Sequence, residues 1–236
     1  MNSPARPILY LLPGLLCDDT IFQAQRDGLA DLCEVRSPHF RGLDSIDAMA
    51  QRVLDEAPGR FALAGFSMAG RVALQIMRLA PQRVERLCLF DTGVKPAAPG
   101  EAQKRQALVD LAYREGMDAL AAVWLPGMLG PASRTNATIT RPLIEMIRRS
   151  TPDDHAKQIK ALVERPDARP VLREIRCPTL VVCGALDEWA PPAQHREIAD
   201  TIAGAKLEVI AEAGHFVSVE QPEAFTRALR DFVAAD

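Results

Sequence analysis

Three residue types in this chain have the spacing that nucleophilic catalysis requires, and the first is a serine. Ser67 lies in the segment 65–70 (GFSMAG), between an apolar run of strand length and a segment of helical period. A serine at such a tight turn is held in a strained conformation that raises its hydroxyl above the sheet. Residues two positions away must be small because the helix passes close to the strand, and Gly65 and Ala69 meet that demand. Ser67 is therefore the candidate nucleophile.

A serine hydroxyl is a weak nucleophile and needs a general base together with an acid that orients the base. His215 follows the last expected strand directly, whereas His39, His155 and His195 are interpreted as solvated side chains outside the site. Loops at the carboxyl ends of parallel strands gather in one crevice, so His215 and a serine far away in sequence can meet there.

Two aspartates are candidates for the orienting acid. Asp187 follows an apolar strand-like run, and Asp91 ends another. Asp187 is preferred because its strand immediately precedes the strand and loop that carry His215. The resulting order along the chain is serine, aspartate, histidine.

The candidate oxyanion donors are two backbone N–H groups, those of Met68 and Leu15. Met68 follows the serine at the start of a helix, where the helix dipole favours negative charge. Leu15 lies in the turn 12–18 (LPGLLCD), where Gly14 permits a sharp bend. An ordinary strand-to-helix turn remains the alternative interpretation of that segment.

The elements that position these residues alternate between apolar runs and segments of helical period. This alternation predicts an α/β fold with a mostly parallel sheet of about six strands and helices on both faces. The expected strands are 7–12, 33–37, 61–66, 86–91, 179–183 and 206–210, and the expected helices are 20–31, 45–57, 68–80, 191–203 and 220–234.

The strand rhythm stops over residues 95–176, where the pattern is helical and interrupted by proline and glycine. The segment is too rich in large apolar side chains for a linker. We therefore expect a core formed by 1–94 and 177–236, with 95–176 as a helical cap. Trp124, Leu125 and Met128 are the candidates for the substrate pocket, although such a stripe is also typical of plain core.

Composition limits the remaining possibilities. With 236 residues, 48 % hydrophobic content and no apolar run near the ~18 residues of a membrane span, the chain is expected to be one non-membrane domain. A net charge of −3 with dispersed basic residues argues against nucleic acid. Five cysteines without a C-x-x-C pair argue against disulfides and zinc, so we expect no metal and no cofactor. No secretory signal is visible, which favours a cytoplasmic location. We expect a monomer or homodimer.

Four segments resemble the α/β-hydrolase superfamily, in its small esterase and lactonase branch: 11–14 (LLPG), 65–70, 184–191 (GALDEWAP) and 214–222 (GHFVSVEQP). The likeness covers 7–93 and 177–234. The segment 40–45 (FRGLDS) is a further likeness of a usually structural kind, and Pro13 stands where the family often has histidine.

The resemblance implies a serine hydrolase that cleaves a small carboxylic ester, lactone or thioester through an acyl-enzyme at Ser67. Other α/β-hydrolase chemistry, such as carbon–carbon bond hydrolysis, lyase or peroxidase reactions, remains an alternative, as does a non-catalytic small-molecule receptor. A dinucleotide-binding loop is disfavoured because Glu85, the acid at the matching distance, would begin a strand rather than end one. The substrate itself stays open.

Overall fold

A sheet of six parallel strands organises the protein, whose computed structural model describes residues 6–235. The strand order is β2-β1-β3-β4-β5-β6, which confirms the expected α/β class and strand number. The strands are β1 (Ile8–Leu12), β2 (Glu34–Arg36), β3 (Phe61–Phe66), β4 (Val84–Phe90), β5 (Thr179–Gly184) and β6 (Lys206–Ile210).

One strand begins earlier than its apolar pattern indicates. β4 starts at Val84, two residues before the expected start at 86, and Val84 pairs with Phe61. The register between β3 and β4 shifts directly after that pair. The irregularity lets exposed Glu85 interrupt the apolar pattern without ending the strand.

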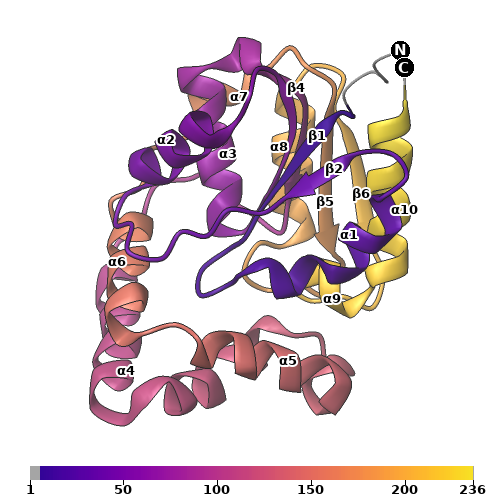
Figure 1. Ribbon diagram of the computed structural model, residues 1–236. Helices are drawn as coiled ribbons and strands as arrows, with labels where there is room; N and C mark the ends of the chain where they lie inside the picture. The colour runs from indigo at the N-terminus through magenta and orange to yellow at the C-terminus, as the bar shows by residue number, and fades with distance from the viewer. Residues whose placement is uncertain (1–5, 236) are drawn as a thin grey trace.

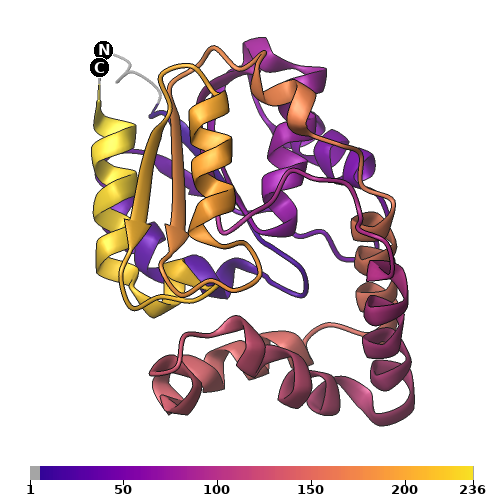
Figure 2. The same cartoon turned by 180° about the vertical axis from the view of Figure 1, so that it is seen from behind.

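Helices cover both faces of the sheet, and every residue of β3 and β5 is buried as a result. Helices α1 and α10 pack together on one face, while α2, α3 and α8 lie on the other (Figures 1 and 2). Their bounds are α1 (Gln23–Leu29), α2 (Ile46–Glu56), α3 (Met68–Leu79), α8 (Pro192–Thr201) and α10 (Pro222–Ala234). Short helices η1 (Asp19–Phe22), η2 (Pro81–Arg83) and α9 (Val217–Glu220) complete this part.

The segment between β4 and β5 is helical. It contains α4 (Glu101–Trp124), η3 (Leu125–Met128), η4 (Ser133–Thr135), α5 (Ala137–Arg148), α6 (Pro152–Val163) and α7 (Arg169–Leu172). Figures 1 and 2 show α4, α5 and α6 as an arm that extends across the carboxyl ends of the strands. Gly116 breaks α4 with a φ of 84°, which turns the arm. Helix α7 packs on α3 instead.

Polar contacts fix this arm to the loops at the strand ends. The guanidinium of Arg149 donates to both carboxylate oxygens of Asp18, at 2.8 and 3.1 Å. The loop 40–45 also contacts the arm, because Gly42 N–H donates to Asp154 at 3.0 Å. None of the helices in residues 6–235 is long and apolar enough to cross a membrane.

Candidate active site

Ser67 occupies a strained turn between β3 and α3. Its φ of 51° and ψ of −114° lie outside the usual regions for a non-glycine residue. A Cβ on Gly65 would lie only 2.5 Å from the carbonyl oxygen of Ala69, and one on Gly70 would lie 2.4 Å from Thr92 Oγ1. The close approach of helix and strand therefore requires glycine at both positions.

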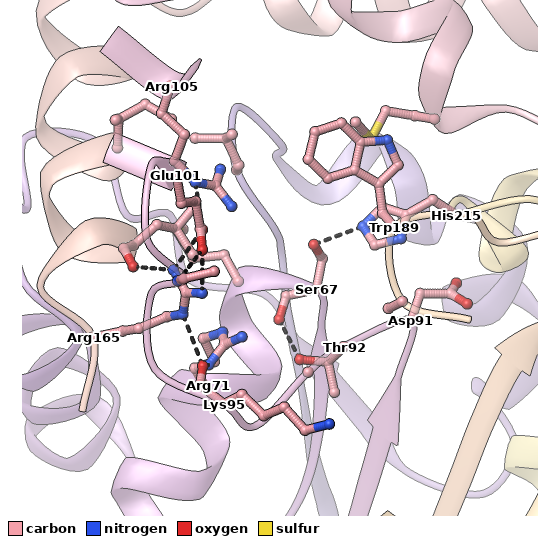
Figure 3. Close-up of a pocket in the computed structure, with 18 of the residues that line it drawn as sticks. Ser67, Arg71, Asp91, Thr92, Lys95, Glu101, Arg105, Arg165, Trp189 and His215 are labelled. Carbon is pink, nitrogen blue, oxygen red and sulfur yellow. Dashed lines mark hydrogen bonds and ion pairs between the residues drawn. The ribbon is translucent and has the colours of Figure 1, made fainter. Parts of the chain in front are cut away.

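The Ser67 hydroxyl faces His215, which follows β6. His215 Nε2 lies 2.7 Å from Ser67 Oγ, and His215 Nδ1 lies 2.8 Å from Asp187 Oδ2. Figure 3 shows the serine and the imidazole directed at each other. With the proton on Nδ1 facing the carboxylate, Nε2 is free to accept the serine proton. These three side chains form one continuous hydrogen-bonded chain.

The Asp187 carboxylate is held in a single orientation. Its side chain is completely buried, and Oδ1 accepts hydrogen bonds from the backbone of Trp189 and Ala190 at 2.8 and 2.9 Å. Because these contacts occupy Oδ1, only Oδ2 is directed at the His215 ring. The aspartate can thereby fix both the tautomer and the angle of the imidazole.

The backbone N–H groups of Leu15 and Met68 have no hydrogen-bond partner among the described residues, and both residues line the same cavity as Ser67. Gly14 allows the Leu15 turn to approach β3 closely, since a Cβ there would lie 2.8 Å from the Phe66 ring. Two unpaired donors beside Ser67 are the arrangement that a developing oxyanion requires.

The cavity above Ser67 measures about 410 Å³ and lies between the strand ends and the helical arm. That size suits a small molecule. Trp124 and Met128, two of the residues expected in the pocket, line it. Leu125 does not, because it begins the turn η3 and its side chain is buried among other apolar side chains.

Basic side chains concentrate on one side of this cavity, away from His215 (Figure 3). They belong to the loop after β4, to α4, to α3 and to the segment after α6. We name them the basic cluster, which consists of Arg71, Lys95, Lys104, Arg105 and Arg165. Sequence reasoning missed this feature, since these residues are scattered over almost a hundred positions.

The sequence of the chain matches a known family. The model of the alpha/beta hydrolase family matches residues 9–228, which is most of the chain. The protein belongs to the alpha/beta hydrolase family. A pimeloyl-[acyl-carrier protein] methyl ester esterase of Photobacterium profundum is 30 % identical over 202 residues, covering 83 % of this chain and 79 % of the relative.

Solved structures agree with this membership. A malate-bound thermophilic esterase from Thermogutta terrifontis has a TM-score of 0.87 at 28 % identity, covering 98 % of this chain and 90 % of that one. The enol-lactonase from Burkholderia xenovorans LB400 has a TM-score of 0.89 at 25 % identity, covering 100 % and 94 %. The likeness thus includes the helical arm as well as the sheet.

In this alpha/beta hydrolase, Asp91 does not face the histidine ring. Its carboxyl oxygens accept hydrogen bonds from Gly184 N–H at 2.9 Å and Val217 N–H at 3.1 Å. Burial, followed by the nearby charge of Asp187, raises the pKa of Asp91 well above its usual value. Asp91 therefore braces the ends of β4 and β5 against the loop that carries the histidine.

The histidine loop of the hydrolase is also fixed to the arm. The Glu220 carboxylate accepts from Gly214 N–H at 3.0 Å and from Gly130 N–H at 2.7 Å. His215 N–H donates to the carbonyl of Met128 at 2.7 Å. Glu220 was not singled out from the sequence, although it lies in the segment 214–222 that carries the family likeness.

The other histidines lie outside the cavity lining, but two of them are not solvated. His155 and His195 are fully buried, and burial lowers the pKa of each to about 4. His195 Nε2 accepts a hydrogen bond from Thr92 N–H at 3.0 Å. A neutral His195 thus supports the residue that packs against Gly70, while His39 is exposed as expected.

Metal-binding clusters of three or more His, Cys, Asp or Glu side chains do not occur within residues 6–235. The five cysteines are free, and all except Cys177 are fully buried.

Proposed function

We propose that this alpha/beta hydrolase cleaves a small carboxylic ester, lactone or thioester through an acyl-enzyme at Ser67. The observation that carries the proposal is the hydrogen-bonded chain from Ser67 through His215 to Asp187, with contacts of 2.7 and 2.8 Å. The similar proteins include a methyl ester esterase, a thermophilic esterase and an enol-lactonase, which supports the same bond type.

The first half of the reaction follows from the contacts. His215 Nε2 accepts the hydroxyl proton as Ser67 Oγ bonds to the carbonyl carbon, and the carbonyl oxygen gains negative charge. The N–H groups of Leu15 and Met68 donate to that oxygen. Asp187 stabilises the imidazolium, which then protonates the leaving oxygen or sulfur as its bond to carbon breaks.

The second half returns the serine. A water molecule attacks the acyl carbon while His215 accepts one of its protons, and the new tetrahedral oxyanion binds the same two N–H groups. The bond to Ser67 Oγ breaks, the histidine returns the proton to that oxygen, and the carboxylic acid leaves. No redox partner is needed, because the reaction consumes only water.

Serine-directed labelling tests the nucleophile. A fluorophosphonate probe is expected to react with the folded protein at one site, and mass spectrometry should locate the adduct on the peptide containing Ser67. A panel of p-nitrophenyl esters, lactones and thioesters should show turnover that the probe abolishes. Labelling elsewhere would contradict the assignment, and labelling without turnover of any panel member would favour another reaction or a receptor.

We further propose that the cap, residues 95–176, selects the substrate by apolar contact. Trp124 lines the cavity and its ring packs edge-on against Phe216 at 6.3 Å. Trp124→Ala should change the specificity constant unequally across acyl lengths, since each lost group is worth about 1–3 kcal/mol. The measurement is kcat/KM across a series of p-nitrophenyl esters.

Leu125 is the matched control, because it is adjacent and buried but lies outside the cavity lining. Leu125→Ala should lower the Tm while leaving the order of acyl preference unchanged. If Trp124→Ala behaves in the same way, the tryptophan is only part of the core and the proposed role of the cap in selection is wrong.

A further inference from the structure

The basic cluster gives the cavity an excess of positive charge close to Ser67. Glu101 is the carboxylate of the lining that faces this cluster. Two guanidiniums already share it: Arg165 donates to both oxygens at 2.7 and 2.8 Å, and Arg105 donates at 2.8 Å. The other three cations of the cluster, Arg71, Lys95 and Lys104, form no ion pair with Glu101.

The charge state of Glu101 agrees with this account. Burial raises the pKa of Glu101, but hydrogen bonds from Arg165, the Ala98 backbone and Arg105 outweigh that effect and bring it to about 2. Its negative charge is thus permanent near neutral pH and is fully engaged by its own arginines. Its charge acts on Arg71 only at a distance, because Glu101 forms its ion pairs with Arg105 and Arg165.

Arg71 is the cation nearest to the candidate nucleophile along the chain. It lies four residues after Ser67 on α3, and so about 6 Å further along the helix axis. Its Nη1 donates to the Lys95 carbonyl at 2.9 Å, and it forms no ion pair with a carboxylate anywhere in residues 6–235. Gly93 leaves room for the head group, since a Cβ there would lie 3.2 Å from Nη2.

The other two cations are less suited to a specific contact. Lys95 pairs with Glu197 at 3.1 Å in an exposed position. Lys104 is exposed on α4 at the cavity border. Arg71 is half-buried. Burial and the charge of Arg165 lower its pKa to about 9 although the charge of Glu101 opposes them, so Arg71 remains charged near neutral pH.

A half-buried guanidinium without a directly paired carboxylate is costly, and a planar carboxylate is the group that matches its paired donors. We propose, on the basis of the ester hydrolysis assigned above to Ser67, that the preferred substrate carries a second, ionised carboxylate that binds Arg71. The substrate is then a monoester, lactone or thioester of a small acid with two carboxyl-derived groups. Its scissile carbonyl lies at Ser67 and its free carboxylate one helical turn away.

The kinetic test compares charged and neutral esters of equal length. Monomethyl esters of linear dicarboxylic acids are paired with methyl esters of monocarboxylic acids that have the same number of chain atoms. Wild-type protein should prefer the charged member of a pair. Arg71→Gln should lower the ratio of the two kcat/KM values about 10- to 100-fold, the range for hydrogen bonds to a charged group.

Two variants control the comparison. Arg71→Lys keeps the charge without the fork and should retain part of the preference. Arg78→Gln removes an exposed arginine from the same helix, outside the cavity lining, and should leave the ratio unchanged. An unchanged ratio in Arg71→Gln would overturn the carboxylate site while leaving ester hydrolysis intact.

A binding measurement separates this proposal from the proposed reaction. Calorimetry with linear dicarboxylates is performed on Ser67→Ala and on Ser67→Ala/Arg71→Gln, with circular dichroism to verify folding. The second variant should bind about 10- to 100-fold more weakly. Weaker binding by the double variant, together with no turnover of any ester by the wild-type protein, would support the carboxylate site and overturn the hydrolysis proposal. Equal affinity, or stronger competition by inorganic phosphate than by any dicarboxylate, would overturn the carboxylate assignment.

Discussion

Ser67→Ala is expected to lower the turnover of an activated ester by about five to six orders of magnitude, as removal of a serine nucleophile does in a comparable hydrolase. The acyl-enzyme cannot form without Oγ. The unpaired N–H donors of Leu15 and Met68 can then stabilise only the slow direct attack of water on the ester. The measurement is kcat with a p-nitrophenyl ester, with active-site titration to exclude contaminating esterase.

Ser45→Ala provides the matched control. Ser45 Oγ accepts a hydrogen bond from Ala48 N–H at 3.1 Å and caps α2, outside the cavity lining. Its loss should cost about 1 kcal/mol of stability and leave kcat unchanged. A Ser67→Ala variant that retained a tenth or more of wild-type turnover would exclude the acyl-enzyme route.

Asp187→Asn should lower kcat by about four orders of magnitude, by analogy with the triad of a serine protease. The amide oxygen should take the place of Oδ1, where two N–H groups donate to it, so the N–H₂ faces His215 Nδ1. His215 then carries its proton on Nε2, toward Ser67, and cannot accept the serine proton. The hydrogen bonds that Oδ1 accepts from Trp189 and Ala190 fix the orientation of the carboxylate toward the imidazole.

Asp91→Asn tests the alternative acid under the same conditions. Its two oxygens accept from Gly184 and Val217, so an amide would retain one of these hydrogen bonds and lose the other. We expect a stability loss of about 1–3 kcal/mol and a change in kcat of less than about tenfold. If Asp91→Asn loses about four orders of magnitude in kcat and Asp187→Asn keeps its activity, the roles of the two aspartates are reversed.

The sequence was sufficient to bring Ser67, Asp187 and His215 to one edge of the sheet. That inference needs only the positions of the strand ends, and the strands are marked by apolar runs that burial on both faces demands. The sequence did not show which side chains of the arm line the cavity. Trp124 and Leu125 are neighbours at the join of α4 and η3, where the turn per residue changes, so the helical pattern cannot separate the lining residue from the buried one.

The basic cluster illustrates a different limit. A chain with net charge −3 and dispersed arginines gives no sign of a positively charged cavity. Arg71 alone had a usable signal, its spacing of one helical turn from Ser67. Arg165 and Glu101 are 64 positions apart, and their meeting depends on how α4 packs against α6. The clamp formed by Glu220 likewise depends on tertiary contacts with the arm.

The arm contributes to the geometry of the site as well as roofing it. Gln158 Oε1 accepts from Leu16 N–H at 2.8 Å, so a cap side chain fixes the turn that presents the adjacent N–H of Leu15. At the other end, the Met128 carbonyl holds the backbone of His215. A chimera made by transplanting the cap of a relative should therefore disturb the proposed base and the proposed oxyanion donors together unless the graft carried equivalents of both contacts. We therefore expect single substitutions in the cavity lining to change selectivity with less damage to the site than exchange of the whole insert.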